Sequence, residues 1–386
     1  MENGSLHKGD KTIWGVFFIF SLASLVLIYS ASSYIAIKQQ GGHNLHFLFK
    51  QLIIIGIGYA VMMGMSRIKY SHYQWGSKLL LFVIIPLLLL TAVLGTNINN
   101  ASRWLTIPFI GISFQSSDFA KIVLLAFLAR SLSKLPSKYE HAGSPLSYII
   151  VGVFAPAIIV SGLILRSNLS TSLLVFISAF YMMWLGQVKI KYLASLVGLG
   201  IISVLIMFLL VKSNPNFFPR FDTWVSRIEN FQGEDRDANY QVTQAKIAIA
   251  SNPLVGSLPG KSSQRAFLPS AHADFIYAII IEEYGTIIGF GFIFFYLILF
   301  YRGMQVARKS ETRFGSLLAM GLMFSIIFQA MINMGVAVNL LPVTGQPLPL
   351  LSMGGTNFIF TSMALGMIQS ISVGLNKEKE ELEAVE

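Results

Sequence analysis

An all-α integral membrane protein is the fold class that the sequence predicts, and its composition and the pattern of its apolar residues support that prediction. Hydrophobic residues make up 54% of the 386 residues and charged residues 12%, whereas soluble domains average ~25% charged residues. The apolar residues stand in continuous runs, while barrel strands would alternate them with polar residues. So much apolar surface excludes a disordered chain, a nucleic-acid-binding module and a cytosolic enzyme.

Ten apolar segments are candidates for transmembrane helices, which need ~20 residues each. They lie at 13–36, 46–66, 76–95, 117–132, 147–165, 168–186, 192–212, 273–301, 314–337 and 353–374. The fourth is short and contains Lys121. The first is longer than the ~7–15-residue apolar core of a signal peptide, so we expect it to be retained as an anchor. Residues 1–386 are thus predicted to form one polytopic membrane domain.

The distribution of positive charge predicts how these helices are oriented. With the N-terminus inside, the inner segments hold 16 Lys and Arg residues, and the short outer loops hold three, Lys38, Arg103 and Arg166. Cytoplasmic loops carry this excess in membrane proteins, and long loops are exempt from the rule. We therefore expect residues 1–12 and 375–386 to be cytoplasmic tails. The extracytoplasmic segments are then 96–116, 338–352 and the large loop 213–272, between helices 7 and 8.

Polar residues at membrane depth are costly and therefore informative, and a first group of them precedes the fourth span. Arg103 stands in an outer loop, Ser116 or Ser117 is expected to cap the helix, and Asp118 and Lys121 follow within its first turns. One interpretation is an interfacial anchor with a local Asp118–Lys121 ion pair. The other is a pair of cations, Arg103 and Lys121, that face an anionic ligand.

A second group lies around the start of the eighth span. The pattern at 240–250 predicts an amphipathic helix, which could lie in the membrane interface. Asp274 follows where the loop becomes the span, and Glu282 and Glu283 lie ~12–13 Å deeper. The helical angles place these carboxylates on different faces, so we do not expect one carboxylate pair. The glutamates are either bonded to neighbouring helices or face a polar cavity. His272, near Asp274, is by itself typical of a structural hydrogen bond.

A third group is rich in proline and glycine. Pro342, Pro347 and Pro349, with glycines on either side, exclude a continuous helix. Irregular backbone at this depth is tolerated only beside protein or a wet cavity. The segment therefore either closes the outer face of the bundle or forms a cavity wall whose backbone contacts a ligand. Separately, Asn168 and the hydroxyls after it, at the start of the sixth span, are expected to cap that helix or bond between helices.

Motifs for other chemistries are missing from the sequence. It has no cysteine, no phosphate-binding loop, no histidine cluster with metal-ligand spacing and no hydrolase nucleophile motif. The residues alone thus predict a membrane protein with an outward-facing polar cavity. Its elements are Arg103, Lys121, Asp274 and the Pro/Gly-rich segment.

Longer strings carry a resemblance to a known family. "NNASRWL", "FQSSDFAK", "YQVTQAKIAI", "LPSAHADFIYAIIIEEYG" and "LLPVTGQPLPLLSMGG" resemble the SEDS proteins (shape, elongation, division and sporulation), in order and over nearly the whole chain. The "YQVTQA" string and the short tails are more similar to the division branch, FtsW. The resemblance implies a SEDS-type bundle that acts as a peptidoglycan glycosyltransferase. It would polymerise lipid II at the outer face of the bacterial cytoplasmic membrane during cell division. A class B penicillin-binding protein and other division proteins would be its partners.

The resemblance also implies a set of site residues. Asp274 would be the essential carboxylate, acting as general base on the acceptor sugar. Substrate-binding positions would be Arg103, Lys121, His272, Glu282, Glu283, Ser352, Gly354 and Gly355. No cofactor is evident, although a divalent cation, Mg²⁺ or Mn²⁺, could assist. The sequence departs from the family at the sixth span, where Asn168 stands in place of a frequent aspartate. Two alternatives remain, a transporter that flips lipid-linked precursors and a non-enzymatic division scaffold.

Overall fold

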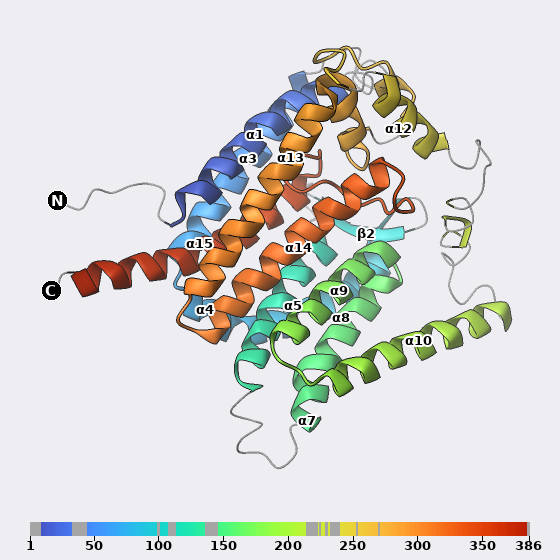
Figure 1. The fold of residues 1–386 in the computed structure, drawn as a ribbon. Helices are drawn as coiled ribbons and strands as arrows, with labels where there is room; N and C mark the ends of the chain where they lie inside the picture. Colours follow the sequence, from blue (N-terminus) through green and yellow to red (C-terminus); the bar gives the residue numbers. More distant parts are fainter. Residues whose placement is uncertain are drawn as a thin grey trace. The chain divides into compact units, whose positions relative to one another are not determined.

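The structure is a computed structural model that describes residues 9–32, 45–98, 101–106, 113–135, 146–213, 223, 225–227, 231, 240–251, 254–268 and 271–383 (Figure 1). The chain divides into two compact units. Unit 1 comprises Met1–Lys69, Arg227–Arg308 and Met323–Glu386, and unit 2 comprises Tyr70–Ser226 and Lys309–Leu322.

All ten predicted apolar segments form helices. Their bounds are α1 (Lys11–Ala31), α3 (Leu45–Arg67), α4 (Tyr70–Leu94), α5 (Ser116–Ser133), α7 (Leu146–Ile149) continued through a π-helical turn η1 (Ile150–Phe154) into α8 (Ala155–Leu165), α9 (Leu169–Leu185), α10 (Ile190–Ser213), α13 (Ile276–Lys309), α14 (Arg313–Ala337) and α15 (Gly355–Glu383). Helix α15 thus continues through most of the predicted C-terminal tail.

Seven of the helical segments in the described residues are long and apolar enough to cross a membrane. Helix α9 and the first part of α10 are apolar but shorter. Helix α5, which carries Asp118, Lys121 and Arg130, is not among the seven. The class of a multi-span helical membrane protein is therefore confirmed, while the count of ten spans stays a prediction.

In unit 1, helix α15 packs along α3 because glycines let the two backbones approach. A Cβ added at Gly58 would lie 2.5 Å from the Phe358 ring, and one at Gly366 would lie 2.7 Å from the Met62 carbonyl oxygen. The start of α1 is tied to α15 through Asp10, whose amide donates to Gln369 Oε1 at 2.7 Å and whose carbonyl oxygen accepts from Gln369 Nε2 at 2.8 Å. These contacts give unit 1 a close-packed apolar core.

Unit 2 contains a small antiparallel sheet that the all-α prediction did not include. Strands β1 (Thr96–Ile98), β2 (Ala101–Thr106) and β3 (Ser113–Gln115) pair in the order β1-β2-β3. The neighbouring helix ends explain it, because the Thr91 hydroxyl at the end of α4 donates to the Ser116 hydroxyl at the start of α5 at 2.9 Å. The chain between them must double back, and strand pairing satisfies its backbone polar groups.

The two predicted helix caps of unit 2 have different outcomes. Neither Ser116 nor Ser117 is the N-cap of α5, because the helix already begins at Ser116 and Gln115 occupies the cap position without a capping bond. Asp118 does lie in the first turn. The expectation for Asn168 is confirmed, since its side chain caps α9 by accepting from the Thr171 amide at 3.3 Å.

Helix α13 is interrupted near its start. Gly285 has φ 81° and ψ 168°, which no helix contains, so segments 276–284 and 286–309 are separate helices. A side chain could not be accommodated there, because a Cβ on Gly285 would overlap the Leu254 carbonyl oxygen. The break lets the loop before α13 cross the helix at this point. The amphipathic helix predicted at 240–250 is also present in this loop, as α12 (Tyr240–Ser251).

Candidate functional site

Asp274 lies in the turn at 271–275 that leads into α13, and its main chain is fixed by α14. The Asn333 amide nitrogen Nδ2 donates to the Asp274 carbonyl oxygen at 2.8 Å and to the Gln346 carbonyl oxygen at 2.7 Å. Asn333 is 1% exposed, so both bonds are shielded from water. One buried amide therefore holds the Asp274 turn and the Pro/Gly-rich segment 338–352 in register with each other.

The segment 338–352, called the 338–352 loop, has no helix or strand. Polar groups of this loop form hydrogen bonds with other parts of unit 1. The Ser352 hydroxyl donates to the Ala273 carbonyl oxygen at 2.6 Å and accepts from the Leu348 amide at 2.7 Å. The Gln329 amide donates to the Pro347 carbonyl oxygen at 3.0 Å. These backbone groups lie beside protein, and a ligand contact by the rest of the segment stays a prediction.

Gly345 is the point at which the 338–352 loop comes close to the Asp274 carboxylate. Its φ is +65°, a conformation that L side chains rarely adopt. A Cβ at this position would lie 3.5 Å from Asp274 Oδ2. A Cβ on Gly354 would make an ordinary 3.6 Å contact with the Asn357 Cβ, and one on Gly355 would lie 3.2 Å from the Ile54 side chain. A substrate-binding role for both glycines stays a prediction.

Arg227 is a residue of this site that the sequence reasoning missed. Its guanidinium Nη1 donates to the Val343 carbonyl oxygen at 3.1 Å. Burial lowers the pKa of Arg227, and the negative charge of Asp274 opposes that shift, so the two groups interact. Arginine stays charged in proteins. No local pattern distinguished Arg227, because it is one of several cations in a long loop for which loop-charge arguments are silent.

His272 lies two residues before Asp274 and contributes its main chain, since its carbonyl oxygen accepts from the Met353 amide at 2.9 Å. Burial lowers the pKa of its imidazole, so the ring is neutral at pH 7. The printed bond is made by the main chain, so a structural hydrogen bond of the His272 ring and a substrate-binding role both stay predictions.

Glu282 and Glu283 are bonded to other parts of unit 1, and they face different partners. The Glu282 carboxylate accepts from the amides of Ser263 at 2.8 Å and Gln264 at 3.1 Å, and also from the Ser262 hydroxyl. The Glu283 carboxylate accepts from the Ser30 hydroxyl of α1. Both are 1% exposed. They do not form one carboxylate pair, as predicted, and their bonds to neighbouring segments match the structural interpretation; a substrate-binding role stays a prediction.

Arg103 and Lys121 belong to unit 2. Arg103 lies on strand β2, next to Trp104, which pairs with Gln115 of β3. Lys121 is half-buried on α5, one turn after Asp118, and both interpretations of this pair stay predictions. Convergence of these two cations with Asp274 is therefore still a prediction.

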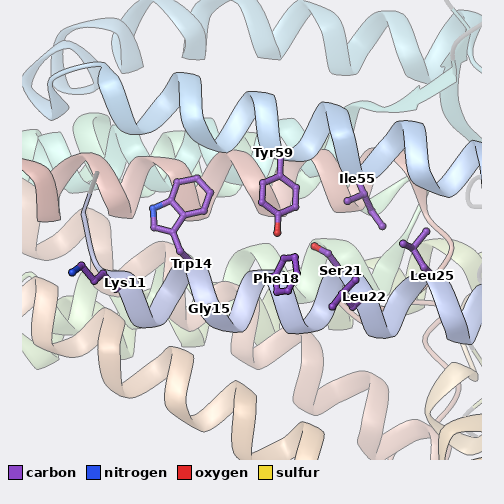
Figure 2. A pocket seen from close by; sticks show the side chains of 9 residues that line it. All are labelled: Lys11, Trp14, Gly15, Phe18, Ser21, Leu22, Leu25, Ile55 and Tyr59. Carbon is purple, nitrogen blue, oxygen red and sulfur yellow. The ribbon is translucent and has the colours of Figure 1, made fainter. Parts of the chain in front are cut away.

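Unit 1 also contains an apolar groove between α1 and α3, with a volume of roughly 610 Å³ (Figure 2). It extends along α1 from Lys11 to Leu25, a rise of ~21 Å. Figure 2 shows the Tyr59 hydroxyl pointing into it, with Trp14 towards the Lys11 end. The Leu25 end is close to the candidate site, because the hydroxyl of the preceding Ser24 donates to the Leu351 carbonyl oxygen at 3.2 Å.

Metal ligation was left open by the sequence. Among the residues that the structure describes, no three His, Asp or Glu side chains are grouped so that they could hold a metal ion. Assistance by a divalent cation, Mg²⁺ or Mn²⁺, therefore stays a prediction.

These features define a class of protein, a helical membrane protein with a carboxylate–guanidinium site where an irregular loop closes a helix bundle. The family follows from comparison: the model of the FtsW/RodA/SpoVE cell cycle proteins matches residues 10–377, and the chain belongs to this family.

Curated relatives extend along almost the whole chain. Peptidoglycan glycosyltransferase MrdB of Escherichia coli is 29% identical over 95% of this chain and 96% of its own length. The probable peptidoglycan glycosyltransferase FtsW of Haemophilus influenzae is 31% identical over 94% and 90%. Stage V sporulation protein E of Bacillus subtilis is 30% identical over 90% and 92%. Because these identities are so similar, assignment to the FtsW branch stays a prediction.

Solved structures show the same fold. The crystal structure of the rod shape determining protein RodA of Thermus thermophilus matches with a TM-score of 0.68 at 22% identity, covering 94% of this chain and 96% of that chain. A chain from a peptidoglycan synthase complex that coordinates polymerization and crosslinking matches with a TM-score of 0.69 at 22% identity, covering 95% and 98%. The SEDS-type fold expected from the sequence is therefore confirmed.

Proposed function

We propose that this protein is a peptidoglycan glycosyltransferase that polymerises lipid II into glycan strands at the outer face of the bacterial cytoplasmic membrane during cell division. The observation that carries the proposal is the arrangement at Asp274, whose main chain is held by Asn333 while its carboxylate lies beside Gly345 and interacts with Arg227. Relatives named peptidoglycan glycosyltransferases match over at least nine tenths of the chain, which supports the same reaction class.

In the proposed reaction, Asp274 acts as the general base. Its carboxylate takes the proton from the 4-hydroxyl of the acceptor GlcNAc. The oxygen attacks the anomeric carbon of the lipid-linked donor, the bond to the pyrophosphate breaks, and a β-1,4 bond forms with inversion. Arg103 and Lys121 stabilise the negative charge that develops on the leaving pyrophosphate.

The lipid part of the substrate needs an apolar surface next to the site. The groove between α1 and α3 has an apolar lining, and its Leu25 end is adjacent to the bond between Ser24 and the 338–352 loop. A prenyl chain that follows this groove would bring the pyrophosphate towards the same loop. This arrangement requires the predicted orientation, with both termini cytoplasmic and the 338–352 loop outside.

The proposed partners follow from the product. Glycan strands need a separate enzyme to crosslink their peptides, and we propose a class B penicillin-binding protein together with other division proteins. The match to a chain of a complex that coordinates polymerization and crosslinking supports this proposal. The transporter and the scaffold are not favoured, because the matching relatives are named for a transferase activity.

The test is a polymerisation assay with purified protein in liposomes that contain lipid II, with and without the transpeptidase. The wild type should form glycan strands. Asp274→Asn keeps the size of the side chain and should lower the rate by ~10²–10⁴, as expected for loss of a general base. Glu311→Gln, at an exposed position between α13 and α14, is the charge-matched control.

Flipping of labelled lipid II in the same liposomes separates the transporter alternative. Polymer formation by Asp274→Asn at the wild-type rate would reject the base role. Flipping without polymer formation by the wild type would reject the transferase.

A further inference from the structure

We propose that Arg227 is a positioning residue for Asp274, in which a guanidinium anchored on the 338–352 loop holds the carboxylate ionised and oriented towards the acceptor hydroxyl. This inference rests on the proposed function, because it assigns Arg227 a role in the same reaction.

The geometry places both groups at the same point of the 338–352 loop. Arg227 Nη1 donates to the Val343 carbonyl oxygen at 3.1 Å. Two residues further, Gly345 approaches the Asp274 carboxylate so closely that an added Cβ would lie 3.5 Å from Oδ2. The segment Val343–Gly345 therefore lies next to both the guanidinium and the carboxylate.

The Asp274 turn and the 338–352 loop are held together by several hydrogen bonds. The Asn333 amide binds the carbonyl oxygens of Asp274 and Gln346, and the Ser352 hydroxyl binds the carbonyl oxygen of Ala273. The Asp274 turn thus cannot shift without the 338–352 loop, to which Arg227 donates. Functional groups held in this way lose little orientation during a reaction, which is how preorganised sites gain rate.

The charges in the site favour the same role. An opposite charge close to a carboxylate favours its ionised form, and a base must be ionised before it can accept a proton. Of the described groups beside the Asp274 turn, the His272 ring is neutral at pH 7, Asn333 is an uncharged amide and Gln346 contributes its carbonyl oxygen. Arg227 supplies a permanent positive charge at this position, which neutral hydrogen-bonding groups cannot replace.

The experiment compares Arg227→Gln and Arg227→Lys with the wild type in the lipid II polymerisation assay between pH 5 and pH 9. Without the positive charge, the pKa of Asp274 rises, so the acid limb of the rate profile of Arg227→Gln should move to higher pH by about one unit or more. Its rate relative to the wild type should fall more at pH 5 than at pH 9, because the carboxylate is ionised at the higher pH. Arg227→Lys keeps the charge, so its acid limb should stay in place while its rate falls less.

Lys246→Gln is the matched control, because Lys246 is an exposed cation on α12 in the same outer loop. Its rate profile should equal that of the wild type. Thermal unfolding of each purified variant in detergent shows which proteins are folded, and rates are compared only per folded protein.

Two results would overturn the inference. One is an Arg227→Gln profile that is lowered equally at every pH, because this would show a purely structural role. The other is a profile equal to that of the wild type. Failure of the proposed function looks different, since it would appear in the same assay as an inactive wild type or a fully active Asp274→Asn.

Discussion

Asp274 and the pair Glu282–Glu283 stand only eight or nine residues apart, yet their carboxylates have different kinds of partner in the structure. Glu282 is surrounded by amides and hydroxyls of residues 262–264, and Glu283 is bonded to Ser30. Asp274 is instead held through its carbonyl oxygen, and its carboxylate interacts with the charge of Arg227.

The difference shows how buried acids acquire different roles in one segment. A carboxylate whose oxygens accept bonds from backbone amides fixes the position of the loop that donates them. A carboxylate whose main chain is fixed separately can take part in chemistry without unfolding its surroundings. We therefore expect substitutions at the Glu282 region to change stability and substitutions at the Asp274 region to change activity.

The largest effect is expected at the break in α13. Gly285→Ala would place a Cβ on the Leu254 carbonyl oxygen in a backbone conformation, φ 81°, that alanine rarely adopts. The outer loop could not cross the helix, so we expect less than a tenth of the wild-type yield of folded protein. Gly291→Ala, at a position in the same helix where a Cβ meets open space, is the control. Detergent extraction followed by size-exclusion chromatography measures the yield, and normal recovery of Gly285→Ala would contradict this account.

A smaller loss of stability is expected for Glu282→Gln. The amide of glutamine cannot accept all the bonds that the carboxylate receives from Ser262, Ser263 and Gln264. Buried donors left without a partner cost ~1–3 kcal/mol each, so the thermal midpoint should fall clearly. Polymerisation per folded protein should stay within about twofold of the wild type. A loss of activity with an unchanged midpoint would place Glu282 in the reaction and erase the contrast with Asp274.

A substitution beside Asp274 should have the converse signature. Gly345→Ala puts a methyl group next to Asp274 Oδ2 and forces alanine to φ +65°, at a cost of about 1–2 kcal/mol. We expect a modest fall in the midpoint and a larger fall in kcat, because the carboxylate is displaced. Kinetics with lipid II measure this, and an unchanged kcat would show that the loop does not set the position of the carboxylate.

The smallest effect concerns His272. Burial holds its pKa below the usual 6.5, so the folded protein keeps the ring neutral while the unfolded chain takes up a proton. The resulting stability is present above pH 6.5 and is lost as the pH falls towards the folded-state pKa. The thermal midpoint of the wild type should therefore drop between pH 7 and pH 5 by more than that of His272→Gln. His46→Gln, at an exposed position on α3, should show the wild-type slope.

The helices could be predicted because each segment is a continuous run of mostly apolar residues, and seven of the described segments are long enough for a membrane span. Features smaller than a helix turn were harder to predict from the sequence. The cap of α5 is displaced by one residue, to Gln115, because Thr91 of α4 engages the Ser116 hydroxyl. The small sheet depends on how close the ends of α4 and α5 lie, which no local pattern contains.

The residues of the candidate site also differ in how far the sequence alone could identify them. Asp274 and the Pro/Gly-rich segment are visible in the sequence, since an acid at a span boundary and prolines at membrane depth both violate the surrounding pattern. Arg227 violates no pattern, because a cation in a long outer loop is unremarkable in composition. Only the bond to Val343 and the interaction with Asp274 distinguish it.

The sequence by itself determined the membrane class, the helical segments, the interrupted backbone of the 338–352 loop and the family. These properties depend on composition and on the order of residues within short segments, and both can be read directly from the sequence. The tertiary structure decided which carboxylates are bonded to protein and which interact with a cation. That outcome depends on contacts between residues far apart in the chain, such as Asn333 with Asp274 and Ser30 with Glu283, and packing alone sets those contacts.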